Sequence, residues 1–196
     1  MKTVIIKYNA GNVQSVMYAL DRLGVSYTYT DDEETIRTAD RVIFPGVGEA
    51  STAMNYLTSK GLSKIIPTLR QPVLGTCIGM QLMCQHSEEN NTTCMGIFDV
   101  DVKRFPTADG YKVPHMGWNN IYDYKSGITD RLSADAYVYF VHSYAAPVNQ
   151  YTVATCNYIQ PFSAVLKKDN FYAAQFHCEI SGKAGETILE NFLKVQ

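Results

Sequence analysis

The segment Pro72–Met83, which reads PVLGTCIGMQLM, joins a short apolar run to a cysteine flanked by two glycines. The apolar run predicts a buried strand over Pro72–Thr76, and the pattern after it predicts a helix from about Gly79 to His86. A Gly-X-Cys-X-Gly turn between a strand and a helix is the nucleophile-elbow pattern with cysteine in place of serine. The segment therefore predicts an α/β sheet in which Cys77 is lifted out at the end of one strand.

The chain before this segment alternates between strands and helices, which is typical of a mostly parallel sheet with helices on both faces. Strands are expected at Thr3–Tyr8, Ser26–Thr30 and Arg41–Phe44. Helices are expected from an Asn12 cap to Gly24, from Asp32 onward, and over Ala50–Leu57 and Leu62–Leu69.

The second half of the chain reads mainly as strands joined by short turns. They are expected at Ile97–Phe105, Trp118–Tyr122, Tyr137–His142, Thr152–Tyr158, Ser163–Leu166 and Phe171–Phe176. Short turns predict antiparallel additions to the parallel core. The chain ends in an amphipathic helix, and no repeat or linker interrupts it, so residues 1–196 are expected to form one domain.

Composition excludes several classes of protein. The net charge of −2 gives no electrostatic case for nucleic-acid binding, and no apolar run approaches the roughly 20 residues that a membrane helix needs. The five cysteines form no CxxC pair, which argues against a disulfide framework or a zinc ribbon. We expect a cytoplasmic protein with no metal and no cofactor.

Two segments predict a nucleophile and its base. At a helix N-terminus Cys77 would be favoured as thiolate, and the Ile78 N–H would point at an oxyanion. The segment Gln175–Glu179 follows a predicted strand, so His177 could act as base for Cys77 while Glu179 orients its imidazole. The alternatives are a buried structural cysteine beside packing glycines and a histidine that only makes a structural hydrogen bond.

Other features give weaker indications. The glycine-rich turn Pro45–Gly48 follows a strand and could supply backbone N–H groups to an anionic centre. His86 is expected late in a helix as a solvated or capping residue. His115 and His142 lie in aromatic-rich segments and could contact a substrate or a partner.

Together these segments resemble the class I, triad-type glutamine amidotransferases over essentially the whole chain. The general features are Pro45–Gly48, Gly75–Leu82, and His177 with Glu179. Three further segments are similar to the glutaminase subunits of imidazole glycerol phosphate synthase, an enzyme of histidine biosynthesis: Tyr8–Asn12, Pro114–Asn119 and Tyr139–Tyr144. The resemblance implies a flavodoxin-like class I amidotransferase fold.

The resemblance also implies roles. Cys77, His177 and Glu179 would be the catalytic triad. Substrate-binding groups would come from Gly46, Gly48, Ile78, Gln81, Glu89, Ser143 and Tyr144. The partner would be a (β/α)₈-barrel cyclase, which receives the ammonia as the other half of a heterodimer. Asn12, Trp118 and Tyr139 would contact it, with core packing as the alternative for the two aromatic residues.

The sequence departs from the family pattern at several places. The family has Pro and Lys around the glutamate after the catalytic histidine, where this chain has Cys178 and Ile180, with Lys183 nearby. Lys7 replaces the usual aspartate before Tyr8, and Glu49-Ala50 replaces an aromatic after Gly48. Two alternatives to a synthase glutaminase stay open: another enzyme on the same elbow, such as a cysteine peptidase or the glutaminase of vitamin B6 synthesis, and a catalytically silent regulator.

Overall fold

The computed structural model describes residues 1–9, 11, 13–125 and 127–195 of the chain. Within these residues seven strands form the main sheet, in the order β11-β12-β13-β4-β3-β1-β2. The strands are β1 (Thr3–Ile6), β2 (Tyr27–Thr30), β3 (Arg41–Phe44), β4 (Val73–Thr76), β11 (Thr152–Tyr158), β12 (Gln160–Lys168) and β13 (Phe171–Ala174). The strands from β13 to β2 run parallel, whereas β12 and β11 are antiparallel additions at one edge.

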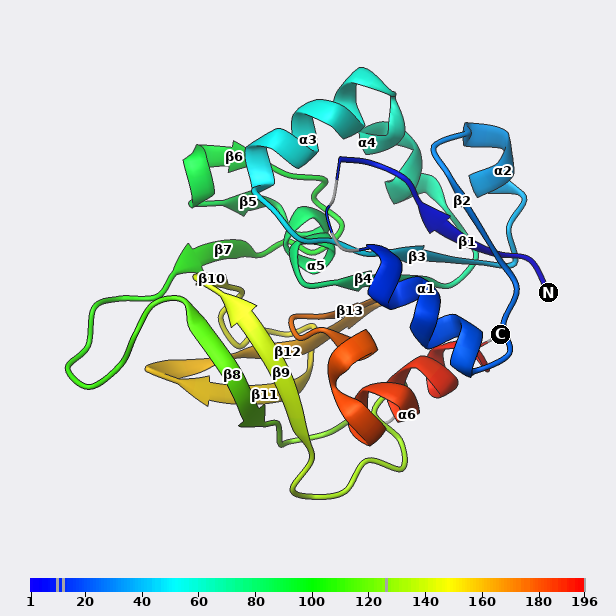
Figure 1. Cartoon of the computed structure of the whole chain (residues 1–196). Coiled ribbons are helices and arrows are strands. Elements are labelled where there is room, and N and C mark those ends of the chain that lie inside the picture. Colours follow the sequence, from blue (N-terminus) through cyan, green and yellow to red (C-terminus); the bar gives the residue numbers. More distant parts are fainter. Residues whose placement is uncertain (10, 12, 126, 196) are drawn as a thin grey trace.

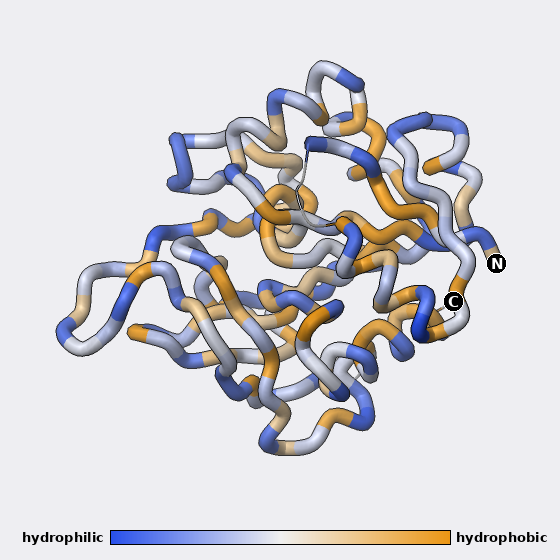
Figure 2. The backbone as a smooth tube through the Cα atoms, viewed as in Figure 1, coloured by the Kyte–Doolittle hydropathy of each residue, from blue (hydrophilic) through white to orange (hydrophobic). Residues whose placement is uncertain are grey.

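Helices cover both faces of the main sheet (Figure 1). One face is covered by α1 (Val13–Arg22) and α6 (Gly182–Phe192), and the other by α3 (Ala50–Ser59), α4 (Leu62–Ile65) and α5 (Ile78–Met83). A short helix α2 (Glu33–Arg37) follows β2, where Asp32 accepts a hydrogen bond from the Thr35 N–H and caps it. The apolar strands lie between these layers, as the hydropathy colouring in Figure 2 shows.

Alternating side chains of the central strands supply the two halves of the core. Ile5, Ile43 and Leu74 pack with α1 and α6, whereas Val4, Val42 and Val73 pack with α3 and α4. This division follows from the two-residue period of a strand, because successive side chains point to opposite faces. All six side chains have at most 1% of their surface exposed.

Two smaller sheets stand over the carboxyl end of the main sheet. One contains β10 (Tyr144–Ala145), β7 (Asp101–Arg104), β5 (His86–Ser87) and β6 (Thr92–Thr93). The other is a two-stranded antiparallel ribbon of β8 (His115–Asn120) and β9 (Tyr137–His142), which we call the ribbon. Three 3₁₀ helices complete the described elements: η1 (Ile66–Thr68), η2 (Glu89–Asn91) and η3 (Cys178–Ile180).

Several expected bounds were wrong. The helix after Cys77 ends at Met83, and His86 lies in strand β5, because Cys84 is extended (ψ 179°) and β5 pairs with β6 and β7. Only Asp101–Arg104 of the expected strand at 97–105 is a strand. The Asn12 cap lies outside the described residues.

No helix in the described part of the chain has the length and apolar character needed to cross a membrane.

Candidate active site

Cys77 stands at a sharp turn between β4 and α5. Its backbone has φ 53° and ψ −115°, a conformation that non-glycine residues rarely adopt and that recurs at functional sites. The turn is held from below by a hydrogen bond from the Cys77 N–H to the Ala174 carbonyl, at 2.8 Å. A Cβ atom on Gly79 would lie 2.1 Å from the Phe44 carbonyl oxygen, so this position needs glycine for α5 to approach β3. The elbow expected from the sequence is therefore present.

The elbow opens into a pocket of about 220 Å³. Its lining residues are Gly48, Cys77, Ile78, Gln81, Glu89, Pro114, Val141, His142, Ser143 and Tyr144. The pocket thus gathers seven of the sequence-predicted site residues, which come from four separate stretches of the chain. It lies where the carboxyl ends of β3 and β4 meet the smaller sheets, as expected for ligand sites in α/β folds.

His177 and Glu179 lie behind the pocket, after β13, and do not line it. His177 Nδ1 is 2.8 Å from Glu179 Oε1, and the two residues are only 2% and 8% exposed. Burial opposes a charge on His177, but its interactions with Cys77 and Glu179 outweigh burial and raise the pKa of His177 above its ordinary value. His177 Nε2 has no hydrogen-bond partner within the described residues, so it is available to exchange a proton at the site.

The Pro45–Gly48 loop closes a further side of the site. The Tyr8 hydroxyl donates a 2.5 Å hydrogen bond to the Pro45 carbonyl, and burial raises the pKa of that phenol. A Cβ atom on Gly46 would lie 2.1 Å from Ile78 Cγ2, which fixes this glycine beneath the pocket. Gly48 lines the pocket itself with φ 121°, a value that favours glycine.

Gln81 and Glu89 form part of the pocket through fixed side chains. Gln81 Nε2 donates to the Tyr144 carbonyl at 2.9 Å and lies 3.0 Å from Gln175 Oε1. Glu89 Oε2 accepts from the Ala50 N–H at 2.7 Å, at the start of α3. Burial raises the pKa of the Glu89 carboxyl.

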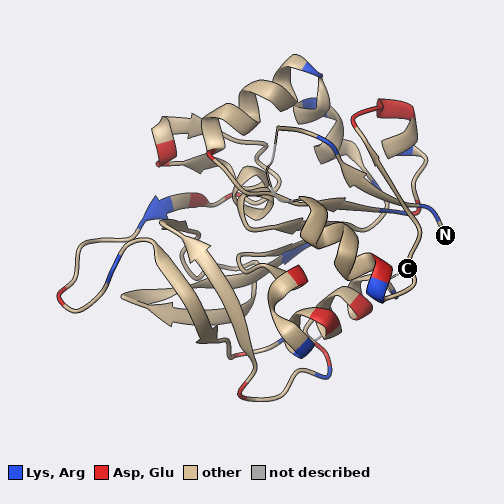
Figure 3. Ribbon diagram, viewed as in Figure 1, with Lys and Arg blue, Asp and Glu red and all other residues tan. Residues whose placement is uncertain are grey.

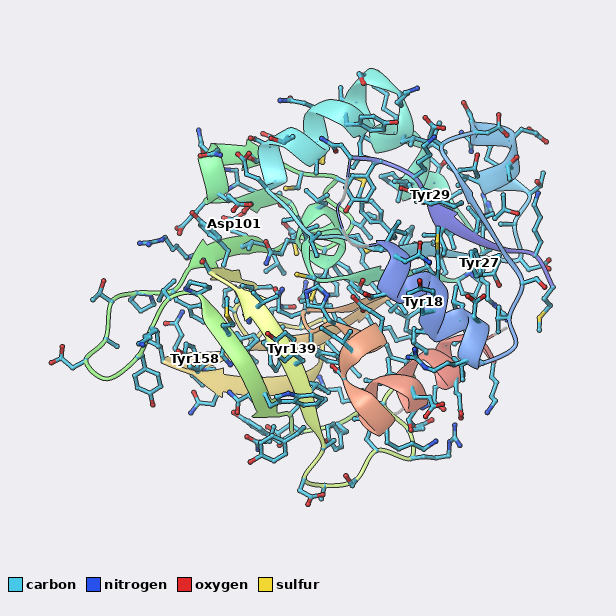
Figure 4. The ribbon with its side chains drawn as sticks, in the orientation of Figure 1. Tyr18, Tyr27, Tyr29, Asp101, Tyr139 and Tyr158 are labelled. Carbon is cyan, nitrogen blue, oxygen red and sulfur yellow. The ribbon has the colours of Figure 1, made fainter. Side chains whose placement is uncertain are left out.

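The predicted contact residues lie apart from the pocket. Trp118 is 55% exposed on β8 and packs edge-on against Tyr139 on β9, with ring centroids 5.9 Å apart. Figure 4 shows Tyr139 on strand β9 of the ribbon. The predicted contact at Asn12 lies outside the described residues.

Sequence reasoning gave little weight to several residues of the site. His142 lines the pocket, and Tyr8 and Gln175 hold Pro45–Gly46 and Gln81 in place. Tyr8 and His142 both lie in segments that resemble the synthase glutaminases, which was the signal available. Nothing in the sequence pairs Gln81 with Gln175, because 94 positions separate them.

The remaining cysteines are unsuited to nucleophilic chemistry. Burial raises the pKa of Cys84, Cys94, Cys156 and Cys178, so each stays a protonated thiol at neutral pH. All five cysteines are free.

A buried histidine–carboxylate pair behind a cysteine elbow is the arrangement of enzymes that transfer acyl groups through a thioester. Comparison with known proteins narrows this class. The family model described as Glutamine amidotransferase class-I matches residues 4–195.

Relatives with similar sequences show which branch of this family the chain belongs to. The imidazole glycerol phosphate synthase subunit HisH of Bacteroides fragilis (strain YCH46) is 59% identical over 196 residues, covering 100% of both chains. The subunit of the same name from Escherichia coli (strain K12) is 44% identical and also covers 100% of both chains. The chain belongs to the class I glutamine amidotransferase family and, within it, to the family of HisH subunits.

Solved structures show the same fold. A crystal structure of a glutamine amidotransferase superimposes with a TM-score of 0.75 at 18% identity, covering 97% of each chain. PurLQS from Thermotoga maritima gives a TM-score of 0.70 at 14% identity, covering 98% of this chain and 97% of that one. The α/β fold and the family expected from the sequence are confirmed.

Proposed function

We propose that this chain hydrolyses glutamine to glutamate and ammonia, and that the ammonia serves imidazole glycerol phosphate formation in histidine biosynthesis. Membership of the class I family supports the glutaminase activity, and the full-length relatives named as synthase subunits support the pathway. The observation that carries the proposal is the pocket, in which Cys77 opens beside Gln81 and Glu89 with His177 buried behind it.

In the proposed reaction the Cys77 thiolate attacks the side-chain amide carbon of glutamine. His177 takes the thiol proton and passes it to the leaving nitrogen, so that ammonia departs and a glutamyl thioester remains on Cys77. Water, losing a proton to His177, then attacks the thioester and releases glutamate. Glu179 holds the imidazole in the required orientation through the 2.8 Å contact at Nδ1.

The oxyanion that forms on the amide carbon needs hydrogen-bond donors. We assign this role to the backbone N–H of Ile78 and to the Gly46–Gly48 loop, which lie beside Cys77. The ends of glutamine fall to Gln81, Glu89, Ser143 and Tyr144. Glu89 suits the α-ammonium group because its carboxylate is half-buried and its Oε2 is held by α3.

We propose a separate (β/α)₈-barrel cyclase as the partner in a heterodimer, docked on the outward face of the ribbon. Met116, Trp118 and Tyr137 on this face are 64%, 55% and 56% exposed. Strands β8 and β9 carry no Lys, Arg, Asp or Glu (Figure 3). Exposed aromatic and methionine side chains without charge are typical of the buried centre of a protein interface.

The departure at Ile180 fits this surface. Ile180 is 40% exposed at the end of η3, and the His177 N–H in the same segment donates to the Tyr139 carbonyl of the ribbon at 3.0 Å. An isoleucine where the family has lysine extends the apolar face towards the triad. Lys183, at 3.2 Å from Glu186, is held in an ion pair on α6.

Two further proposals concern the whole chain. We propose that residues 1–196 form one amidotransferase domain, since the family model spans residues 4–195. We also propose a cytoplasmic location, because five free cysteines suit a reducing compartment.

The test is glutamate release by the chain alone, with the barrel cyclase, and with the cyclase and its ribonucleotide substrate. We expect slow release by the chain alone and a rise of about 10²-fold or more in the loaded complex. The expected reason is that the loaded partner aligns one oxyanion donor of the site, and one such donor contributes about 10²–10³ in rate. No release under any condition would support a silent regulator. Cleavage of peptides without glutamine turnover would support the peptidase alternative. A maximal rate in the isolated chain would contradict control by the partner.

A further inference from the structure

Two buried histidines at the pocket, of which one lines it and the other contacts the first, are not used by the proposed reaction. His115 on β8 and His142 on β9 are 3% and 6% exposed. His115 is stacked on Tyr158 at 3.9 Å between ring centroids, and on Phe140 at 4.8 Å. Tyr158 ends strand β11 beside the ribbon (Figure 4). Polar rings at such a depth need hydrogen-bond partners.

The hydrogen-bond partners of the two rings form one continuous series, in which the donor and acceptor of each bond are fixed. The Tyr144 carbonyl can only accept, so His142 donates to it from Nδ1 at 2.8 Å. A neutral His142 ring then accepts at Nε2, so the donor 3.2 Å away is His115 Nδ1. His115 in turn accepts at Nε2 from the Asn119 amide, at 3.4 Å.

Both rings are neutral at pH 7. Burial lowers the pKa of His115 to about 4 and that of His142 to about 3. Neutrality allows each ring to be a donor on one side and an acceptor on the other, which is what the chain from Asn119 to Tyr144 requires.

The chain ends on the wall of the pocket. The Tyr144 carbonyl also accepts from Gln81 Nε2 at 2.9 Å, so both of its lone pairs have donors. Ser143 and Tyr144 line the pocket together with Cys77 and Gln81. A carbonyl held from two sides fixes the orientation of the Tyr144 peptide, and with it this wall.

We propose that His115 and His142 are positioning residues that hold the Ser143–Tyr144 wall for binding the amino-acid end of glutamine. The inference rests on the proposed function for the identity of the ligand. It assigns no proton transfer to His115 or His142, because His177 carries the proton in the proposed reaction. Loss of these hydrogen bonds should therefore weaken glutamine binding and leave the bond-breaking steps largely intact.

Two substitutions of His142 separate its two hydrogen bonds. An asparagine amide occupies the place of Nδ1, so His142→Asn can still donate to the Tyr144 carbonyl. A glutamine amide occupies the place of Nε2, so His142→Gln keeps the contact with His115 and loses the bond to Tyr144. His115→Phe keeps the stacked ring between Tyr158 and Phe140 and removes the donor to His142.

The experiment measures glutaminase kinetics of each variant in complex with the cyclase. We expect His142→Gln to raise KM for glutamine about tenfold, the usual result of losing one buried hydrogen bond, with kcat within about threefold of the unsubstituted chain. His142→Asn should recover most of that loss. His115→Phe should raise KM by about fivefold, and it tests the same chain if His142→Gln does not fold.

Equal KM in all three variants and the unsubstituted chain would overturn the inference. So would a fall in kcat with KM unchanged, since that result would place the histidines in the chemical steps. An unsubstituted complex with no glutaminase activity would instead overturn the proposed function, which keeps the two failures distinct.

Discussion

Cys77 differs from every other cysteine of the chain in having both a strained backbone and an open pocket. We predict that Cys77→Ser lowers glutamine turnover by at least about 10³-fold, because a serine hydroxyl in this setting is a far weaker nucleophile than a thiolate. Serine at Cys84, Cys94 or Cys156 should retain turnover. Steady-state glutamate release decides the matter, and near-normal turnover by Cys77→Ser would exclude the thioester mechanism.

His177 and Glu179 are both buried, yet their substitutions should differ in effect. We predict that His177→Ala abolishes hydrolysis, because the described residues offer no other group that could act as the base in place of His177 Nε2. Glu179→Gln should cost less, about 10- to 100-fold, since an amide oxygen can still accept from Nδ1 and only the charge is lost. Initial rates at saturating glutamine provide the measurement. Mild and equal losses for the two variants would remove both from the site.

Some residues of the site could be predicted from the sequence, and others could not. Cys77 and His177 were predictable because local patterns, a glycine-flanked turn and a strand end, place them at one edge of the sheet. The bond between His115 and His142 was not, because it depends on the register of β8 against β9. Register brings positions 27 apart into contact, and no local pattern encodes it.

The glycine loop at Pro45–Gly48 is the first element whose behaviour can be tested. Gly48 has φ 121°, where any side chain is strained, while Gly46 is locked by Ile78 and Tyr8. We predict that Gly48→Ala lowers the cyclase-stimulated rate by about 10²-fold, with cyclase binding unchanged, because a side chain at this φ strains the loop and displaces one oxyanion donor. Stimulated rates and a binding titration should be compared. Intact stimulation would show that this loop supplies no oxyanion donor.

The ribbon is the second such element. We predict that Trp118→Asp weakens cyclase binding by about 100-fold, because it places a charge at the centre of an uncharged apolar face. The substitution lies outside the pocket, so glutamine turnover at saturating cyclase should stay close to normal. Lys183→Ala, which removes an exposed side chain of α6, is the matched surface control. Unchanged binding by Trp118→Asp would move the interface away from the ribbon.

The elements were predicted unevenly, for a physical reason. The apolar strands of the main sheet and the amphipathic helices that cover it were placed within a few residues. Strands β5, β6 and β10 are two residues long and show no periodicity. Their backbone pairs hold the pocket side of the molecule, so the part of the fold closest to the ligand is the part that local patterns encode least.

At the scale of the whole molecule, stability should respond to acid through the buried histidine pair. His115 and His142 have their pKa lowered to about 4 and about 3. A histidine in the unfolded chain has a pKa of about 6.5. Between these limits the unfolded chain binds more protons than the folded one, so the free energy of unfolding falls as pH falls from about 6.5 towards 4. His177, whose pKa is raised, keeps its proton in the folded state throughout this range. It adds no slope below about pH 5.5, where the unfolded chain has bound that proton too.

The groups near the pair are His177, which lies within electrostatic reach of His142, and the Tyr158 phenol stacked on His115. We therefore predict that replacing His115 by Phe reduces the slope of unfolding free energy against pH by about 1.4 kcal/mol per pH unit between pH 6 and 4.5, one proton's share. Urea unfolding at a series of pH values gives both slopes, and the exposed carboxylates contribute equally to each. Parallel lines for the two proteins would mean that His115 already binds a proton in the folded state, and the directional chain to Tyr144 would then be wrong.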